Sequence, residues 1–297
     1  ICRSISSPKV RFLQEGIIQE NTPAFPCYHG FIYGSLKVGC HAHGSPLPLV
    51  PALATSCNSY FCWGLFRMFG DRKYGSPQNA ITVWKDHMVS QGFGYKLGVD
   101  LPSEGRGLIP NAAFYDKPYK GRWNGLTVIS IAIGQGEILA TPLQIANLSA
   151  TIANRGHFIT PHIVKEIQDN QLDSIYRTPR VPTIDRIHYE EVVKGMRAAV
   201  TGGTCRIAGY MFPEGEICGK TGTAQNRGHD HSAFMGFAPM NNPKIAIAVY
   251  VENGGFGATY GVPIGTLMIE QYLNGKLSPA SEAKAAEFSD RIIMYGD

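Results

Sequence analysis

A run of three strand-like segments near the C-terminal end restricts the fold of this sequence more than any other feature. The segments cover residues 216–224, 232–238 and 244–251 and are rich in apolar and small residues. The last two are joined by PMNNP at residues 239–243, and Pro and Asn favour turns. We therefore predict one antiparallel sheet in this part of the chain.

Helical patterns dominate the earlier part. The predicted helices cover residues 10–18, 52–69, 141–154, 189–199 and 260–273. The third is the most distinct, because Thr141 can cap its first turn and Pro142 suits the first helical position. Helices gathered early and strands gathered late predict an α+β domain, with an antiparallel sheet and helices packed around it.

The composition is that of an ordinary globular domain. Apolar residues make up 44% of the 297 residues and charged residues 17%, values near the average for folded proteins, so we predict a single domain over residues 1–297. The formal net charge is +4 and no run of five or six basic residues occurs, which argues against nucleic acid as a partner. No apolar stretch reaches the length of about 18 residues that a membrane-spanning helix needs.

The first of the three strand-like segments carries Lys220, Thr221, Gly222 and Thr223 in succession. A strand can present the cation of Lys220 and the hydroxyl of Thr221 to a carboxylate, while Gly222 lets a substrate backbone approach closely. Taken alone, these residues also fit a tight turn at the end of a strand.

Two serine motifs precede this strand. Ser56 and Asn58 lie within the second predicted helix; in a turn between helices they could flank one cavity, but Ser56 could also be a simple helix cap. Ser6 and Lys9 are three residues apart at a helix start and share one face. Lys9 could then take the proton of Ser6, if burial and the nearby charge of Lys220 keep its amine neutral.

The motifs S-x-x-K, S-x-N and K-T-G occur here in the order found in serine penicillin-recognising enzymes. The sequence between them resembles the transpeptidase domain of class B penicillin-binding proteins, most closely the elongation type, over about residues 14–273. The matching stretches are GVDLPSE at 98–104, GLIP at 107–110, IGQG at 133–136, ATPLQ at 140–144, GTAQN at 222–226 and ENGG at 252–255.

This resemblance implies the penicillin-binding protein and β-lactamase-like fold. It also implies a serine acyltransferase that cross-links peptidoglycan stem peptides and is acylated by β-lactams. Ser6 resembles the acylated nucleophile, Lys9 its base, and Ser56 and Asn58 the second motif. Lys220, Thr221, Gly222 and Thr223 resemble the opposite wall, and the backbone N–H groups of Ser6 and Thr223 would form an oxyanion hole.

The N-terminal motif departs from the family in two ways. Arg3, Ser4 and Ile5 stand where the family has Pro-Gly before its nucleophile, and only four residues separate Lys9 from Gln14, about one helical turn fewer than in the family. The resemblance further implies a membrane anchor and a pedestal domain outside this chain, and a membrane glycosyltransferase of the shape and elongation class as partner. The catalytic domain would lie in the periplasm, anchored to the inner membrane.

Cysteine and histidine crowd the loop before the second motif. Cys27, Cys40, His43 and Cys57 could form a four-coordinate thiolate and imidazole site suited to structural Zn²⁺. His41 could replace His43, and a disulfide between Cys27 and Cys40 is the alternative in a periplasmic protein. Because Cys57 stands between Ser56 and Asn58, such a zinc ion would stiffen the loop that carries both.

Two other functions fit the same motifs. A β-lactamase must also activate a water to hydrolyse the acyl-enzyme, and the Glu-x-x-Leu-Asn loop of its class A type is absent from the sequence. The other alternative is a penicillin sensor that binds without turnover. The matches to the class B transpeptidase domain between residues 98 and 144 favour the transpeptidase over a β-lactamase.

Overall fold

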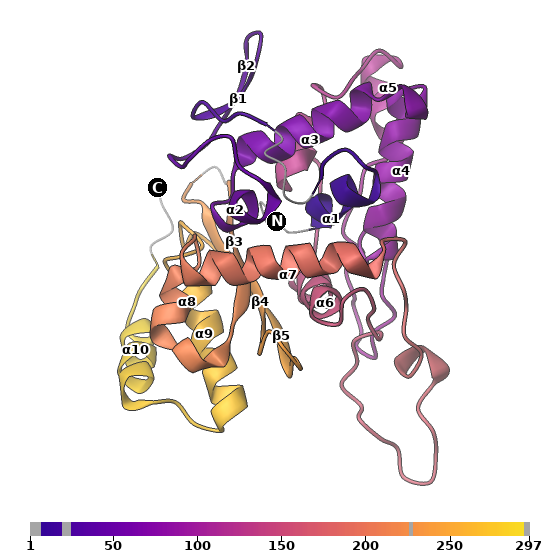
Figure 1. Ribbon diagram of the computed structural model, residues 1–297. Coiled ribbons are helices and arrows are strands. Elements are labelled where there is room, and N and C mark those ends of the chain that lie inside the picture. The colour runs from indigo at the N-terminus through magenta and orange to yellow at the C-terminus, as the bar shows by residue number, and fades with distance from the viewer. Residues whose placement is uncertain (1–6, 20–24, 226–227, 294–297) are drawn as a thin grey trace.

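The computed structural model describes residues 7–19, 25–225 and 228–293 (Figure 1). The strands are β1 (Gly30–Tyr33), β2 (Leu36–Gly39), β3 (Cys218–Ala224), β4 (His231–Ala238) and β5 (Ile245–Val251). The helices are α1 (Ser7–Gln14), α2 (Leu49–Ala54), α3 (Asn58–Gly70), α4 (Pro77–Ser90), α5 (Ala112–Tyr119), α6 (Pro142–Ala153), α7 (Arg186–Thr201), α8 (Arg206–Met211), α9 (Gly261–Asn274) and α10 (Pro279–Ser289). Among the described residues, no helix is long and apolar enough to cross a membrane.

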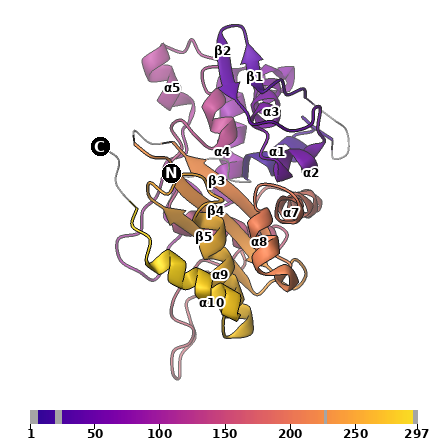
Figure 2. The same ribbon diagram turned by 90° about the vertical axis from the view of Figure 1, so that its left-hand side faces the viewer.

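The three strands near the C-terminal end form one antiparallel sheet in the order β3, β4, β5. Lys220 on β3 pairs with Met235 on β4, and Met235 pairs in turn with Ala248 on β5. The predicted α+β class and the predicted strands are therefore confirmed. A separate hairpin of β1 and β2 projects from the other half of the molecule (Figure 2).

The central strand β4 separates two hydrophobic cores. Met235 and Phe237 on one face belong to the larger core, which includes buried residues of α2, α3, α4, α6 and α7. Phe234 on the other face packs with Val262 and Ile269 of α9 in the smaller core. Figures 1 and 2 show α7 crossing one side of the sheet and α9 with α10 covering the other. Burial of one such side chain contributes about 1.5 to 3 kcal/mol, so both layers hold the sheet in place.

The single helix predicted over residues 52–69 is wrong, because α2 ends at Ala54 and α3 begins at Asn58. The Thr55 hydroxyl donates to the carbonyl of Pro51 at 2.9 Å, and Ser56 takes a left-handed conformation with φ of 57°. The Cys57 side chain then caps α3 by accepting the N–H of Tyr60. The break places Ser56 in a turn between two helices.

The other predicted helices agree with the structure to within a few residues. Thr141 caps α6 in a full capping box with Gln144, as the sequence predicts. α7 is longer than predicted and starts at Arg186.

Helix α1 is anchored at its C-terminal end by Glu15. The Glu15 carboxylate accepts hydrogen bonds from the Tyr74 hydroxyl at 2.6 Å and from His87 Nε2 at 2.9 Å, and it pairs with Lys73 Nζ at 3.0 Å. Partial burial raises the pKa of Glu15, but these three partners outweigh it and lower the pKa to about 2. The network ties α1 to α4 and to the short 3-10 helix Arg72–Tyr74.

Candidate functional site

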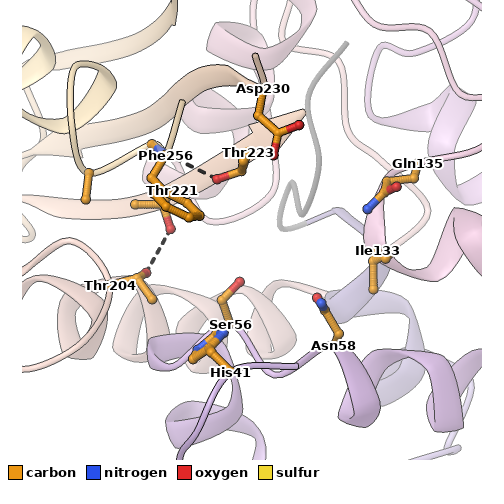
Figure 3. Close-up of a pocket in the computed structure, with 12 residues that line it drawn as sticks. His41, Ser56, Asn58, Ile133, Gln135, Thr204, Thr221, Thr223, Asp230 and Phe256 are labelled. Atoms are coloured by element: carbon orange, nitrogen blue, oxygen red, sulfur yellow. Dashed lines mark hydrogen bonds between the residues drawn. The ribbon is translucent and has the colours of Figure 1, made fainter. Parts of the chain in front are cut away.

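A cavity of about 400 Å³ opens between strand β3 and the turn that joins α2 to α3 (Figure 3). Ser56 and Asn58 form its floor in Figure 3, and Thr221 and Thr223 come from the strand above them. Its complete lining is His41, Ser56, Asn58, Ile133, Gln135, Thr204, Thr221, Thr223, Asp230, Phe256, Gly257 and Ala258. The structure thus brings together two motifs that stand far apart in the sequence.

Lys220 joins these two motifs directly. Its Nζ atom donates a 2.8 Å hydrogen bond to Ser56 Oγ and a 3.0 Å bond to the carbonyl of Thr221. The residue is only 1% exposed, because β3 is covered on this face by α7 and the larger core. A buried ammonium group held against a serine hydroxyl can replace a proton that the hydroxyl gives up, and it can stabilise negative charge close to it.

Asn58 reaches the cavity from the first turn of α3. Its side-chain Nδ2 donates to the carbonyl of Gly39 at 2.8 Å, and its backbone N–H donates to Cys40 Sγ at 3.3 Å. Both contacts come from the end of the β1–β2 hairpin and the loop after it. The position of this amide therefore depends on the fold of the cysteine-containing loop.

The K-T-G strand presents its hydroxyls to the cavity. Thr221 Oγ1 donates to Thr204 Oγ1 at 2.9 Å, and Thr223 Oγ1 accepts the backbone N–H of Gly257 at 3.4 Å (Figure 3). Gly222 between them is buried. The backbone of Gly257 lies so close to it that a Cβ atom on Gly257 would lie 2.6 Å from the carbonyl oxygen of Gly222.

Sequence reasoning missed several residues of the cavity wall. Thr204 lies in the loop between α7 and α8, where only the preceding pair of glycines marks an unusual backbone. Asp230 and Phe256 lie in the loops that flank β4 and β5. Gln135 belongs to the IGQG stretch that carried the family resemblance, although the sequence assigned it no role.

The proposed nucleophile cannot be placed. Ser6 lies outside the described residues, and Lys9 lies within α1, where only its backbone is described.

The four residues predicted to bind zinc do come together. One ligand atom from each of Cys27, Cys40, His43 and Cys57 lies within 4.8 Å of the others. Cys40 Sγ is 3.3 Å from His43 Nε2, and the three cysteines are free thiols. His41 Nε2 instead contacts the carbonyl of Thr55, which makes His43 the imidazole of the set.

The three thiols differ in how readily they lose the proton that a metal ion must replace. A hydrogen bond from the Cys57 thiol, together with those from the Asn58 N–H and His43, lowers the pKa of Cys40 to about 4 despite its partial burial. The same contact with Cys40 raises the pKa of Cys57, and burial raises the pKa of Cys27. A metal ion must bind all three as thiolates. Three sulfur ligands and one imidazole around a common centre form a group that could hold a metal ion.

Residues 12–268 match the family described as penicillin binding protein transpeptidase domain. The chain belongs to this family. The matched range contains the second and third motifs but starts after Ser6 and Lys9, so it leaves the nucleophile untested. Membership confirms the predicted transpeptidase fold.

Named relatives point to the elongation type within this family. The peptidoglycan D,D-transpeptidase MrdA of Acinetobacter baumannii is 36% identical over 228 residues, which cover 70% of this chain and 32% of the relative. The Escherichia coli K12 protein of the same name is 29% identical over 87% of this chain and 42% of its own length. The chain thus spans about a third of the length of the first of these curated relatives.

Solved structures give the same result. Penicillin-binding protein PBP2 of Pseudomonas aeruginosa has a TM-score of 0.78 and 30% identity, over 94% of this chain and 60% of that one. PBP2 of Helicobacter pylori, solved in complex with MreC, has a TM-score of 0.74 and 26% identity, over 92% of this chain and 49% of that one. Both the fold and the family are therefore those expected from the sequence.

Proposed function

We propose that this chain is the catalytic domain of an elongation-type peptidoglycan D,D-transpeptidase, which cross-links stem peptides and is blocked by β-lactams. The observation that carries this proposal is the 2.8 Å hydrogen bond from the buried Lys220 to Ser56, which lines a cavity together with Asn58, Thr221 and Thr223. The family match over residues 12–268 supports it.

The proposed reaction is an acyl transfer in two steps. The hydroxyl oxygen of Ser6 attacks the carbonyl carbon of the last peptide bond of a donor stem peptide, and its proton passes to the amine of Lys9. The bond to the terminal residue breaks, and the departing nitrogen takes a proton from the hydroxyl of Ser56. Lys220 then gives a proton to the oxygen of Ser56. An amine of a second stem peptide then attacks the ester carbonyl, and its proton passes through Ser56 to Lys220. The ester bond to Ser6 breaks, and Lys9 returns its proton to the serine oxygen.

The cavity can hold both ends of the reacting group. The cation of Lys220 and the hydroxyls of Thr221 and Thr223 suit the terminal carboxylate of the donor peptide or of a β-lactam. The amide of Asn58 lies across the cavity from Thr221 and Thr223 (Figure 3) and suits a carbonyl on the substrate backbone. A β-lactam acylates the same serine, but its leaving nitrogen stays attached to the acyl group, so the ester persists.

A fluorescent penicillin separates the candidate functions. We expect the chain to be labelled once and to keep the label for hours, because a transpeptidase does not activate a hydrolytic water efficiently. Loss of label within minutes would indicate a β-lactamase, and absence of labelling would contradict acyl transfer. A labelled chain that fails to exchange a D-amino acid into a D-alanyl-D-alanine peptide would instead be a penicillin sensor.

We infer that the metal of the Cys27, Cys40, His43 and Cys57 group is a structural Zn²⁺. Three thiolates and one imidazole form a common closed tetrahedral zinc site, which leaves no position for a catalytic water. Cys57 caps α3 and Cys40 accepts the N–H of Asn58, so the ion would fix the turn that carries Ser56. Zinc would supply rigidity and take no part in the chemistry.

The remaining proposals concern the whole protein. The chain spans about a third of its first curated relative, and we propose that a membrane anchor and a pedestal domain lie in the rest. The anchor would hold the catalytic domain at the periplasmic face of the inner membrane, where stem peptides are. One neighbouring structure is described as a peptidoglycan synthase complex that coordinates polymerization and crosslinking, which supports a membrane glycosyltransferase as partner. Co-purification of the full-length protein with such an enzyme tests this.

A further inference from the structure

Thr204 belongs to none of the three motifs, and the proposed mechanism gives it no role. It lines the cavity beside the K-T-G strand, and its hydroxyl lies 2.9 Å from that of Thr221 (Figure 3). Thr221 is the hydroxyl that the proposed function gives to the substrate carboxylate. Thr204 therefore contacts the proposed binding group from within the same cavity.

The backbone around Thr204 is fixed before any ligand arrives. Its N–H donates to the carbonyl of Ala54 at 3.1 Å, at the end of α2. Gly203 packs so closely on the same carbonyl that a Cβ atom there would lie 2.3 Å from it. On the other side Cys205 is fully buried, and its N–H donates to Ala199 at 2.9 Å. The hydroxyl of Thr204 is thus held at a set distance from both α2 and β3.

The hydroxyl of Thr221 donates its proton to Thr204, and Thr204, which is also a hydroxyl, can act as acceptor or as donor. A hydroxyl group has one proton to donate and two positions to accept. Lys220 Nζ lies 3.4 Å from Thr221 Oγ1, and the proton of Thr221 goes to Thr204. When a carboxylate enters, Thr221 can turn its proton toward the anion, and its oxygen can then accept a hydrogen bond in the direction in which it had donated one. The hydroxyl of Thr204 can become the donor of that bond.

We propose that Thr204 is a positioning residue for carboxylate recognition, since its hydroxyl orients that of Thr221 toward an anionic ligand. This inference rests on the proposed function for the identity of the ligand, a substrate or β-lactam that carries a free carboxylate. Thr204 itself need not touch the ligand. Its contribution is larger for a charged ligand than for a neutral one, because hydrogen bonds to charged groups are the stronger ones.

Two substitutions of Thr204 isolate its hydroxyl. Thr204→Val keeps the shape of the side chain and removes the hydroxyl, whereas Thr204→Ser keeps the hydroxyl. Each variant is acylated with benzylpenicillin and with its methyl ester, which lacks the anionic carboxylate. We expect Thr204→Val to slow acylation by the acid about tenfold and acylation by the ester about twofold or less. Thr204→Ser should stay close to the unsubstituted chain with both compounds.

A purely structural role of Thr204 would give a different pattern. Thr204→Val would then slow both compounds equally, or Thr204→Ser would be as slow as Thr204→Val, and either result overturns the proposal. An unchanged ratio of acid to ester rates in Thr204→Val overturns it as well. A thermal melt of each variant shows whether it is folded.

A binding experiment separates this inference from the proposed reaction. NMR titration with a peptide ending in D-alanyl-D-alanine, as the free acid and as the C-terminal amide, reports carboxylate recognition without chemistry. We expect this chain to prefer the acid and Thr204→Val to lose that preference. If the unsubstituted chain is not acylated but prefers the acid, and Thr204→Val loses that preference, the proposed reaction fails while Thr204 retains its role. If Thr204→Val keeps the preference, the role of Thr204 is wrong. If the unsubstituted chain shows no preference for the acid, the role of Thr204 is wrong as well.

Discussion

Lys220 Nζ lies 2.8 Å from Ser56 Oγ although the two residues are 164 positions apart. Lys220 comes from the middle of β3, and Ser56 from a left-handed turn between α2 and α3. Helix α7 packs against both α2 and β3 and so holds the two motifs together. In the proposed mechanism, the transfer of a proton to the leaving nitrogen depends on this distance.

Replacing Lys220 should therefore abolish most of the activity with little cost in stability. We expect Lys220→Ala to lower the rate of penicillin acylation at least about a hundredfold. The melting temperature should change little, because a water in the cavity can replace the hydrogen bond to Ser56. Lys244→Ala, which removes an exposed lysine from the connection just before β5, should acylate normally. An equal fall in stability and rate for Lys220→Ala would assign this lysine a structural role.

Peptide mapping after penicillin treatment should find the adduct on Ser6. This serine alone among its neighbours has a lysine three residues further along, at Lys9. Ser6→Ala should lose the label, whereas Ser4→Ala and Ser7→Ala should keep it. An adduct on Ser4, Ser7 or any other serine would refute the assignment.

The sequence predicted the sheet well because its information is local. Residues 216–251 alternate strand patterns with turn residues, and the structure places all three strands there. The break between α2 and α3 was missed, because the apolar pattern continues through it. That break depends on the Cys57 cap and on the contact between His41 and the carbonyl of Thr55, and neither partner can be read from helical periodicity.

The sequence predicted the site only where reactive or metal-binding residue types occur in a recognisable pattern. Lys220, Ser56 and Asn58 stand in short motifs, and the soft ligands around Cys57 are crowded within one loop. Thr204 carries no such sign, since a threonine after two glycines is common and only the fold brings it to β3. Helix α4 and the β1–β2 hairpin were not predicted either, because their short or mixed patterns gave no clear period.

The close approach of Gly203 to α2 should make that glycine irreplaceable. A Cβ atom would lie 2.3 Å from the carbonyl of Ala54 and 2.8 Å from the Cα of Ala199, so Gly203→Ala must displace the loop. We expect a loss of about 1 to 3 kcal/mol in the free energy of unfolding, together with slower acylation. Gly202→Ala is the matched control, because no atom lies within 4 Å of its Cβ position. Chemical denaturation of both variants tests this, and equal stability would contradict the packing argument.

The anchor of α1 should give the protein a pH-dependent stability. The pKa of Glu15 is about 2 in the folded chain and near 4.3 in an unfolded one. The contribution of Glu15 to the free energy of unfolding is therefore fully present above about pH 5 and is lost as the pH falls toward 2. We expect Glu15→Gln to cost about 1 to 2 kcal/mol at pH 7, less than the full shift implies because solvent screens the partly exposed pair with Lys73.

Unfolding by urea at pH 7, 5 and 3 measures this difference. The gap between Glu15→Gln and the unsubstituted chain should narrow at pH 3. Glu190→Gln is the control, since Glu190 pairs with Arg155 at 3.4 Å but is 46% exposed, and its loss should cost about 0 to 1 kcal/mol. A gap that stays constant from pH 7 to 3 would show that the carboxylate charge of Glu15 is not what anchors α1.

Zinc should bind close to one equivalent per chain in protein purified without added metal, because three thiols and an imidazole already lie within 4.8 Å of one another. Cys57→Ser is the informative change, since a serine oxygen can still cap α3 but is a much poorer zinc ligand. We expect elemental analysis to find little zinc in this variant, with a lower melting temperature and slower acylation, because binding energy at such a site becomes folding energy for the loop that carries Ser56 and Asn58. Cys62→Ala removes a buried thiol of the same helix outside the group and should keep its zinc. Native protein without metal, in which mass spectrometry finds Cys27 bridged to Cys40, would replace the zinc site with a disulfide.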